Sequence, residues 1–266
     1  MPTTICFINQ KGGCGKSSSC FHLGGHFARS GRSVLLVDAD PQGSLSQGFF
    51  GSAAIEGLPA GESLAAVFDD ATPLSALVVP TPFPGLSMVR ANAALGRHNC
   101  PEPETFGLKQ FALAALLEEA TNYDLVLIDC PPNLYQCSWN ALLAADFVVV
   151  PVPPEDFATQ GLRAIHQAVG HARHLNPRLA LLGHLVIRAD SRLLVHRSYE
   201  QHLRRLYGEA VLSTVIPEAS AYKLALSTRT PVSFHSPSSR AARLVRDLGD
   251  ELLRRAAPPA ERRKIA

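Results

Sequence analysis

Residues 3–18 read TTICFINQKGGCGKSS, and this stretch decides the fold. Its first part, residues 3–9, is β-branched and apolar, which predicts a buried strand. Residues 16–30 carry Cys, Leu, Gly and Phe along one face, which predicts a helix that ends at Gly31. A strand, a glycine-rich turn and a helix that opens with Lys-Ser together predict a binding site for phosphate groups.

The turn between this strand and this helix has the residues that phosphate binding needs. Gly12, Gly13 and Gly15 let backbone N–H groups converge on a phosphate without interference from Cβ atoms. The N-terminus of the helix adds a partial positive charge. We expect Lys16 to reach the β- and γ-phosphates of a nucleotide and the Ser17 hydroxyl to bind Mg²⁺.

One position departs from the usual phosphate-loop pattern G-x-x-x-x-G-K-[ST]. Gln10 stands where the first Gly is expected and Lys11 follows it, which gives the deviant form K-G-G-x-G-K-[ST]. A lysine inside the loop can add a second positive charge at the phosphates. If its side chain points away from its own nucleotide, it can serve a nucleotide held by a neighbouring subunit.

Three aspartates come at the ends of expected strands. Asp129 ends the apolar run LVLI of residues 125–128, where an acid that binds Mg²⁺ directly or through water is expected. Asp38 and Asp40 follow the expected strand 33–37, and a carboxylate there can orient the attacking water or hold a water of the metal. Each aspartate could instead cap a turn, but three of them beside a phosphate loop favour a functional role.

The rest of the chain alternates between short apolar runs and helical segments. Further strands are expected at residues 33–37, 86–90, 124–129, 147–152, 179–187 and 211–216. Further helices are expected at residues 63–68, 74–77, 107–121, 138–145, 160–174, 192–206, 220–227 and 239–255. Apolar strands that alternate with helices predict an α/β fold of three layers, in which helices flank a mostly parallel twisted sheet. We expect a single domain over residues 1–257 and a disordered basic tail over residues 258–266.

Composition bounds the function. The chain has 266 residues, 46% of them hydrophobic, which suffices for one large core. No apolar run is long enough to span a bilayer and no signal peptide is expected, so we expect a cytoplasmic protein.

Six scattered cysteines without a C-x-x-C pair fit reduced thiols better than disulfides or a metal site. The net charge of +2 is unevenly distributed. Residues 1–158 hold 7 Lys and Arg and 15 Asp and Glu, whereas residues 159–266 hold 18 Lys and Arg and 8 Asp and Glu. The basic second half fits either a polyanion-binding face or an ordinary solvated surface.

These motifs resemble the ParA/MinD family of ATPases, whose phosphate loop is a deviant Walker A motif, and in particular its ParA-like branch. The matching blocks follow the family order and run almost from end to end, and only residues 44–105 lack a clear counterpart. The blocks are NQKGGCGKSS (9–18), LLVDADPQG (35–43), YDLVLIDCPP (123–132), NALLAAD (140–146), VPV (150–152), DSR (190–192), TVIP (214–217), PV (231–232) and SR (239–240).

The resemblance implies a role for each site residue. Lys11 resembles the signature lysine that reaches across an ATP-sandwich dimer to the partner's phosphates. Asp40 resembles the residue that positions the hydrolytic water, and Asp129 resembles the Walker B acid; both are expected near the metal together with Ser17. The expected catalytic residues are Lys11, Lys16, Asp40 and Asp129. The expected nucleotide contacts are Lys11, Gly12, Gly13, Cys14, Gly15, Lys16, Ser17 and Ser18, with Pro217 beside the adenine.

The resemblance also implies a function. Such proteins are weak Mg²⁺-dependent ATPases, whose ATP-bound dimers coat nucleoid DNA without sequence preference and position plasmids, chromosome origins or other large cargo. A ParB-like or other partner protein stimulates hydrolysis and release. The expected DNA contacts are Arg192, Lys223, Arg240 and Arg243. Two departures count against DNA binding, because the family often has Arg where this chain has Glu218 and Ala221.

The sequence raises three alternatives to this function. The ATP dimer can be a binding module for a protein partner, as in relatives that serve secretion, cellulose synthesis or flagellar placement, and never touch DNA. A MinD-like membrane anchor needs a C-terminal amphipathic helix, which residues 258–266 do not form because they hold two prolines and almost no apolar face. An iron-protein ATPase similar to nitrogenase reductase needs cluster-binding cysteines, for which Cys100 and Cys130 are the candidates.

Overall fold

A computed structural model describes residues 1–70, 72–155 and 158–257, and it contains one mostly parallel sheet in the order β3-β4-β2-β5-β1-β6-β7-β8. The strands are β1 (Thr3–Phe7), β2 (Val34–Asp38), β3 (Val78–Pro80), β4 (Leu86–Val89), β5 (Leu125–Asp129), β6 (Phe147–Val152), β7 (Ala180–Ala189) and β8 (Ile216–Pro217). The edge strand β3 pairs antiparallel with β4, whereas the other pairs of neighbouring strands are parallel. The sequence-based prediction of an α/β fold is therefore confirmed.

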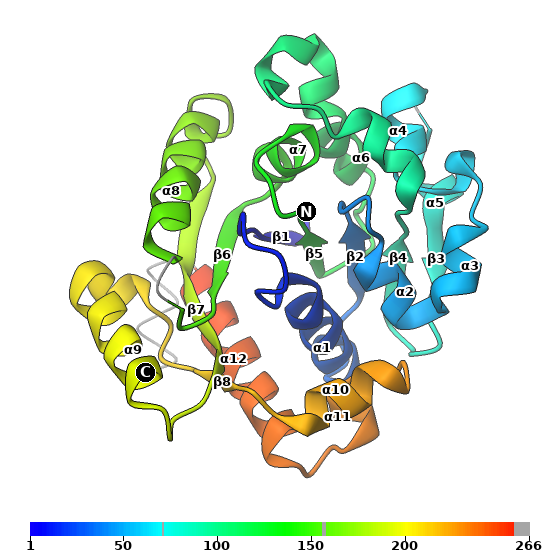
Figure 1. Cartoon of the computed structure of the whole chain (residues 1–266). Coiled ribbons are helices and arrows are strands. Elements are labelled where there is room, and N and C mark those ends of the chain that lie inside the picture. Colours follow the sequence, from blue (N-terminus) through cyan, green and yellow to red (C-terminus); the bar gives the residue numbers. More distant parts are fainter. Residues whose placement is uncertain (71, 156–157, 258–266) are drawn as a thin grey trace.

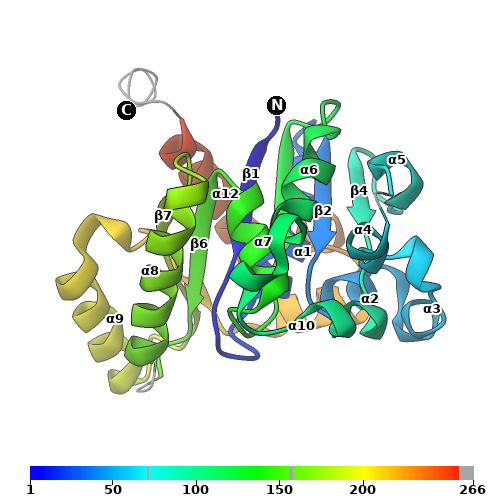
Figure 2. The ribbon, with the colours of Figure 1, turned by 90° about the horizontal axis from the view of Figure 1, so that it is seen from above.

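Helices cover both faces of this sheet (Figure 1), and the view from above shows the same layers from another side (Figure 2). The α-helices are α1 (Lys16–Arg29), α2 (Ser44–Phe50), α3 (Ser52–Glu56), α4 (Ala65–Asp69), α5 (Leu74–Leu77), α6 (Ala112–Glu118), α7 (Gln136–Ala144), α8 (Ala158–Leu175), α9 (Leu194–Tyr207), α10 (Ser220–Ser227), α11 (Val232–His235) and α12 (Arg240–Ala256). Short 3-10 helices lie at Ala60–Glu62, Ala93–His98, Pro103–Phe111 and Gly208–Ala210.

The core is divided by the sheet into two apolar clusters. Along β1, Cys6 faces the cluster that α4 to α9 complete, whereas Ile5 and Phe7 face the cluster built with α1, α2 and α10 to α12. The alternation arises because successive side chains of a strand point to opposite faces. Both faces are covered, which explains why β1, β2 and β5 are apolar almost throughout.

Two predicted elements differ from the structure. The helix expected over residues 107–121 is a 3-10 helix, Pro103–Phe111, followed by α6, because Gly107 has φ 56 and interrupts the helical backbone. The strand expected over residues 211–216 shrinks to β8, Ile216–Pro217. There the carboxylate of Glu251 accepts the backbone N–H groups of residues 213 and 214 at 2.7 and 2.8 Å, so these groups are not available to a strand.

The carboxyl ends of β1, β2 and β5 lie side by side at the centre of the sheet. The register pairs Phe7 with Asp129 and Asp38 with Asp129, so the two aspartates end neighbouring strands at the same level. Ligands of open α/β sheets bind outside the carboxyl ends of the strands, and the loop after β1 is at this edge. The tail 258–266 lies outside the described residues. Over the part of the chain that is described, no helix combines the length and apolar character that crossing a bilayer requires.

Candidate functional site

The loop between β1 and α1 has a backbone that requires glycine at two positions. Gly13 has φ +68 and Gly15 has φ +89, both in the left-handed region where residues with a Cβ are disfavoured. Gly15 is the N-cap of α1, and its carbonyl accepts the N–H of Ser19 at 2.9 Å. The chain therefore turns directly from the strand into the helix, with its free amides at the positive end of the helix.

Lys16 folds back across this loop. Its side chain is buried, with the residue only 6% exposed, and its ammonium group donates to the carbonyls of Asn9 at 3.1 Å and Lys11 at 3.2 Å. The Cys14 sulfur lies 3.8 Å from the same nitrogen, and burial raises the pKa of the Cys14 thiol. The hydrogen bonds of Lys16 to oxygen atoms among the described residues go to backbone carbonyls, so the buried ammonium is well placed to attract an anion.

Asn9, at the end of β1, fastens the start of the loop. Its amide nitrogen donates to the Pro151 carbonyl at 2.7 Å, and its side-chain oxygen accepts the backbone N–H of Lys11 at 3.0 Å. The loop is thus tied to β6 as well as to β1. Asn9 lies inside the expected strand 3–9 and was not singled out from the sequence.

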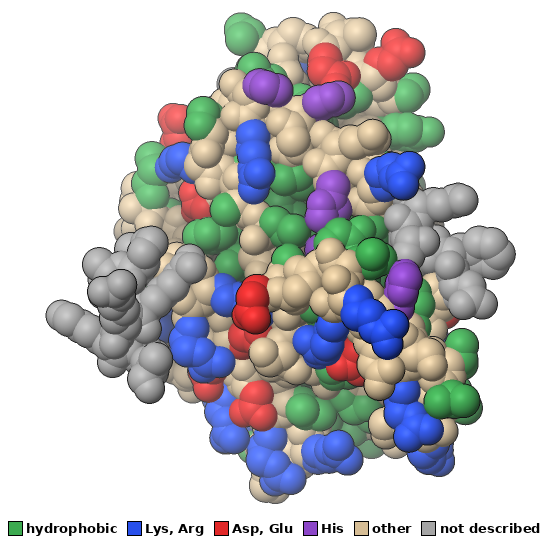
Figure 3. All heavy atoms as spheres, turned by 90° about the vertical axis from the view of Figure 1, so that its left-hand side faces the viewer, with side chains coloured by type: hydrophobic (Ala, Val, Ile, Leu, Met, Phe, Trp, Pro, Cys, Tyr) green, Lys and Arg blue, Asp and Glu red, His purple; other side chains and the backbone are tan. Residues whose placement is uncertain are grey.

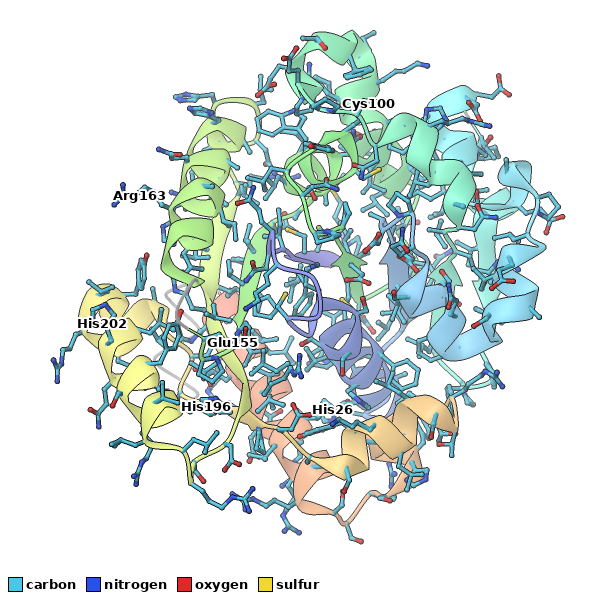
Figure 4. All side chains as sticks on the ribbon, viewed as in Figure 1. His26, Cys100, Glu155, Arg163, His196 and His202 are labelled. Atoms are coloured by element: carbon cyan, nitrogen blue, oxygen red, sulfur yellow. The ribbon has the colours of Figure 1, made fainter. Side chains whose placement is uncertain are left out.

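Lys11 forms an ion pair with Glu155, which lies just beyond the end of β6 (Figure 4). The two side chains are 39% and 50% exposed, so solvent screens this pair. The ammonium group of Lys11 is therefore at the surface, where it is accessible to a second molecule. Glu155 was missed from the sequence because it is 144 residues away from Lys11.

The carboxylates of Asp38 and Asp129 are both completely buried beneath the loop. Asp129 makes no close, well-aligned hydrogen bond among the described residues, but the Ser17 hydroxyl is near enough to act on it as a donor. Burial raises the pKa of Asp129 well above its ordinary value, and the nearby Asp38 raises it further, whereas the Ser17 hydroxyl and the Lys16 charge lower it. A buried carboxylate beside a serine hydroxyl and a lysine fits a position that receives the water ligands of a metal ion.

Asp38 and Asp40 shape the turn after β2. Asp38 accepts the backbone N–H and the hydroxyl of Ser46 at 2.8 and 2.7 Å, and burial raises its pKa to about 7. Asp40 accepts the N–H of Gln42 at 2.9 Å. Burial also raises the pKa of Asp40, whereas the positive charge of Lys16 lowers it.

The residues with metal-binding chemistry fit Mg²⁺ held partly by a nucleotide. In the described ranges, His, Cys, Asp and Glu do not gather in groups of three that could hold a metal alone. Mg²⁺ prefers one or two protein ligands, substrate phosphates and several waters. Ser17 in the loop and the buried Asp129 carboxylate near it match this preference.

A cavity of about 500 Å³ opens over the loop. Such a volume falls within the range of small-molecule and cofactor sites. Its walls bring together residues that are far apart in the sequence: the loop and the start of α1, the turn at Asp40, and the segment from β8 to α10 that includes Pro217. All of the predicted loop residues from Gly12 to Ser18 line it, whereas Lys11 points to Glu155 outside it.

The four residues predicted to contact DNA are spread over two helices and one loop. Arg192 lies in the loop after β7, and its guanidinium donates two hydrogen bonds to Asp190, at 3.0 and 2.8 Å. Lys223 on α10 pairs with Glu218 at 2.6 Å. Arg243 on α12 donates to a backbone carbonyl, and Arg240 begins the same helix. Lys and Arg side chains gather in the lower half of the face seen in Figure 3, the side of the molecule that holds α9 in Figure 1.

Comparison with known proteins finds similar proteins that match this chain over most of its length. A family model described as an AAA domain matches residues 2–181. The chromosome-partitioning ATPase Soj of Thermus thermophilus is 38% identical over 255 residues, which cover 94% of this chain and 95% of that protein. The sporulation initiation inhibitor protein Soj of Bacillus subtilis is 31% identical and covers 95% of this chain and 98% of its own.

Among solved structures, cobyrinic acid a,c-diamide synthase from Mycobacterium smegmatis, with bound ATP analogue and magnesium, has a TM-score of 0.81 and 28% sequence identity. The alignment covers 96% of this chain and 95% of that chain. The near-complete coverage of the Soj proteins, together with the lysine-containing glycine loop at the carboxyl end of β1, leads to one conclusion. The chain belongs to the Soj/ParA family of P-loop ATPases.

Proposed function

We propose that this chain is a weak Mg²⁺-dependent ATPase whose ATP-bound dimer binds DNA without sequence preference and positions DNA or another large cargo. We also propose that residues 1–257 act as one ATPase unit. The observation that carries the proposal is that the buried Lys16 ammonium and the Ser17 hydroxyl both lie near enough to the completely buried Asp129 carboxylate to lower its pKa. This arrangement supplies a cation for phosphate and an acid for the waters of a metal.

The site residues divide the chemical work among them. The amides of the loop from Gly12 to Ser18 and the Lys16 ammonium would hold the phosphates of ATP or ADP, and Pro217 would contact the adenine. Ser17 and Asp129 would hold Mg²⁺, which neutralises charge on the terminal phosphates when it is bound. Asp40 sits at the cavity wall within the field of Lys16, where its carboxylate can orient a water toward the γ-phosphate.

Lys11 is the residue proposed to contact the nucleotide of the second subunit. In the single chain its ammonium group is already neutralised by Glu155, and exposed pairs of this kind contribute at most about 1 kcal/mol. A triphosphate in a second subunit carries more negative charge than one carboxylate. Exchange of Glu155 for that phosphate therefore costs little, and we propose that Lys11 makes this contact in the ATP-bound dimer.

DNA binding is supported by the basic second half of the chain and by the chromosome-partitioning names of its relatives. Contacts from arginine and lysine to phosphates would make the binding sequence-independent and salt-sensitive. We propose that Arg192, Lys223, Arg240 and Arg243 provide them, with the protein in the cytoplasm on the nucleoid and a ParB-like or other partner stimulating hydrolysis.

A second candidate function has a specific observation in its favour. The Lys223 ammonium is paired with Glu218, so its charge is partly neutralised on the surface that would meet DNA. An ATP dimer with such a surface could instead be a switched binding module for a protein. The two functions differ in whether DNA is bound at all.

The proposal is tested by titrating fluorescent duplex DNA of unrelated sequences with the protein in Mg-ATP, in Mg-ADP and without nucleotide. We expect tight binding only with ATP, equal for all sequences, and loss of binding in about 0.5 M salt. Binding that ignores the nucleotide would contradict the ATP switch. Intact ATP-dependent dimerisation without any DNA binding would select the protein-binding module instead.

A further inference from the structure

Arg188 occupies an irregular position near the end of β7. The register between β7 and β8 shifts between Ile187 and Ala189, so Arg188 is the extra residue of a bulge. Its φ is 60, a left-handed conformation that is unfavourable for a residue with a Cβ. Bulges and strained residues of this kind re-aim side chains and are frequent beside functional sites.

The re-aimed side chain reaches the phosphate loop. The Arg188 Nη1 atom donates to the carbonyl of Gly13 at 2.9 Å, although the two residues are 175 positions apart. The Arg188 Nε atom donates to a carboxylate oxygen of Glu218 at 3.0 Å. One guanidinium group therefore joins the loop to the residue that follows β8, and it uses the fork geometry that lysine lacks.

Glu218 anchors this guanidinium to the opposite wall of the cavity. Its backbone N–H donates to the Ala189 carbonyl at 3.1 Å, and its second carboxylate oxygen pairs with Lys223 at 2.6 Å. The two cations hold the pKa of Glu218 below its usual range. Both Arg188 and Glu218 line the 500 Å³ cavity, together with Pro217 and the loop.

The contact with Gly13 bears on the geometry of phosphate binding. A trans peptide is planar, so its C=O and the following N–H point in opposite directions. The Gly13 carbonyl is held toward Arg188, so the Cys14 N–H points away from Arg188. The Cys14 backbone belongs to the loop that lines the cavity, and amides of such loops bind the α- and β-phosphates.

We propose that Arg188 is a positioning residue for the nucleotide: it fixes the orientation of the peptide between Gly13 and Cys14 and locks the phosphate loop to the segment after β8. Its effect should therefore fall on ADP and ATP alike, because both carry the α- and β-phosphates. The proposal rests on nucleotide binding by the loop, and the titration of the wild-type protein tests that binding separately.

The test compares Arg188→Met and Arg188→Lys with the wild-type protein. The affinities for a fluorescent ADP and a fluorescent ATP analogue are measured with Mg²⁺, and unfolding is measured without nucleotide. Loss of a charge-assisted hydrogen bond predicts that Arg188→Met weakens both ligands by about 5- to 30-fold. Arg188→Lys should recover part of the affinity, since an ammonium group can reach one of the two acceptors. The unfolding temperature without nucleotide should change by only a few degrees.

Two further variants keep the test decisive. Arg178→Met changes an arginine with a 68% exposed side chain near the other end of β7, and it should bind both nucleotides like the wild type. Glu218→Gln leaves the Gly13 contact in place but weakens the anchor, so we expect a smaller loss of about 2- to 5-fold. Affinities of Arg188→Met and Glu218→Gln within twofold of wild type, or a loss confined to ATP, would overturn the proposal. A wild-type protein that binds neither nucleotide would instead refute the site itself.

Discussion

Replacing Gly15 with alanine should destabilise the protein without nucleotide, and the structure gives the size of the effect. Gly15 has φ +89, and a Cβ built there would lie 2.6 Å from the Cδ1 atom of Ile187. The left-handed backbone costs about 1–2 kcal/mol with a Cβ present. Moving Ile187 out of its rotamer adds about 0.5–1.5 kcal/mol, since carbon atoms prefer separations of about 3.5–4.0 Å. We therefore expect a loss of about 2–3 kcal/mol in the free energy of unfolding.

Gly12→Ala is the matched control for this prediction. It lies in the same loop, but a Cβ there would have no atom within 4 Å and its φ is not in the left-handed region. Its free energy of unfolding should stay within about 1 kcal/mol of the wild type, because a compatible Gly→Ala change acts mainly on the unfolded chain. Urea unfolding of the three proteins measures the differences, and a loss of 2–3 kcal/mol corresponds to a decrease of roughly 4–12 °C in Tm.

A double variant separates the two contributions. Ile187→Val removes the Cδ1 atom, so in the Gly15→Ala protein it should cost less stability than the roughly 0.5–1.5 kcal/mol expected in the wild type. The explanation is refuted if Gly15→Ala unfolds within about 0.5 kcal/mol of Gly12→Ala. If Ile187→Val lowers the free energy of unfolding equally in the wild type and in Gly15→Ala, the predicted clash between the new Cβ and the Ile187 Cδ1 atom is refuted. The backbone strain at position 15 would then remain as the explanation.

Three other changes test the acids and the cationic surface. Burial raises the pKa of Asp38 to about 7, so the folded protein binds a proton that the unfolded chain has already lost, and stability should fall as pH rises from about 4 to 7. Asp38→Asn should therefore show a smaller fall in the free energy of unfolding over this range, measured by urea titrations at several pH values. Glu218→Gln, assayed with saturating ATP analogue, should increase DNA affinity and steepen its salt dependence, whereas Lys223→Ala should lower the slope by about 1. Asp40→Ala should bind ATP normally but accumulate an ATP-bound dimer in size-exclusion chromatography, because the acid proposed to orient the water is missing.

Each of these predictions has a contradicting result. An unchanged pH dependence in Asp38→Asn would mean that this carboxylate does not titrate in the stated range. Equal DNA affinities of Glu218→Gln and wild type would mean that the pair of Glu218 and Lys223 does not belong to the DNA-binding surface. Normal ATP turnover in Asp40→Ala would disprove the assigned role of Asp40.

The sequence predicted the loop and the sheet because their signals are local. The glycines and Lys16 follow directly after the apolar residues of β1, and Asp129 ends another apolar run. Such patterns depend only on neighbours in the chain, so they can be read without a structure. The α/β class is confirmed, and the structure brings the predicted loop, Asp40 and Pro217 to one cavity.

Residues that act through distant contacts could not be predicted. Arg188 is one of many arginines in the sequence, and its role arises only because a bulge turns it toward a carbonyl 175 residues away. The strand expected over residues 211–216 is short for a similar reason, since Glu251 on α12 captures two backbone N–H groups from a distance of 37 or 38 residues. Local propensity is overridden in such places by tertiary hydrogen bonds.

The central claim is that the loop of residues 11–18 binds the phosphates of a nucleotide through the buried Lys16 ammonium. The most direct measurement is a calorimetric titration of the wild-type protein and of Lys16→Ala with a non-hydrolysable ATP analogue and Mg²⁺, with the exposed Lys109→Ala as the control. We predict one nucleotide per chain for the wild type and for Lys109→Ala, and a loss of at least about 100-fold in affinity for Lys16→Ala. Equal affinities in all three proteins, or heat of binding in none of them, would contradict the claim.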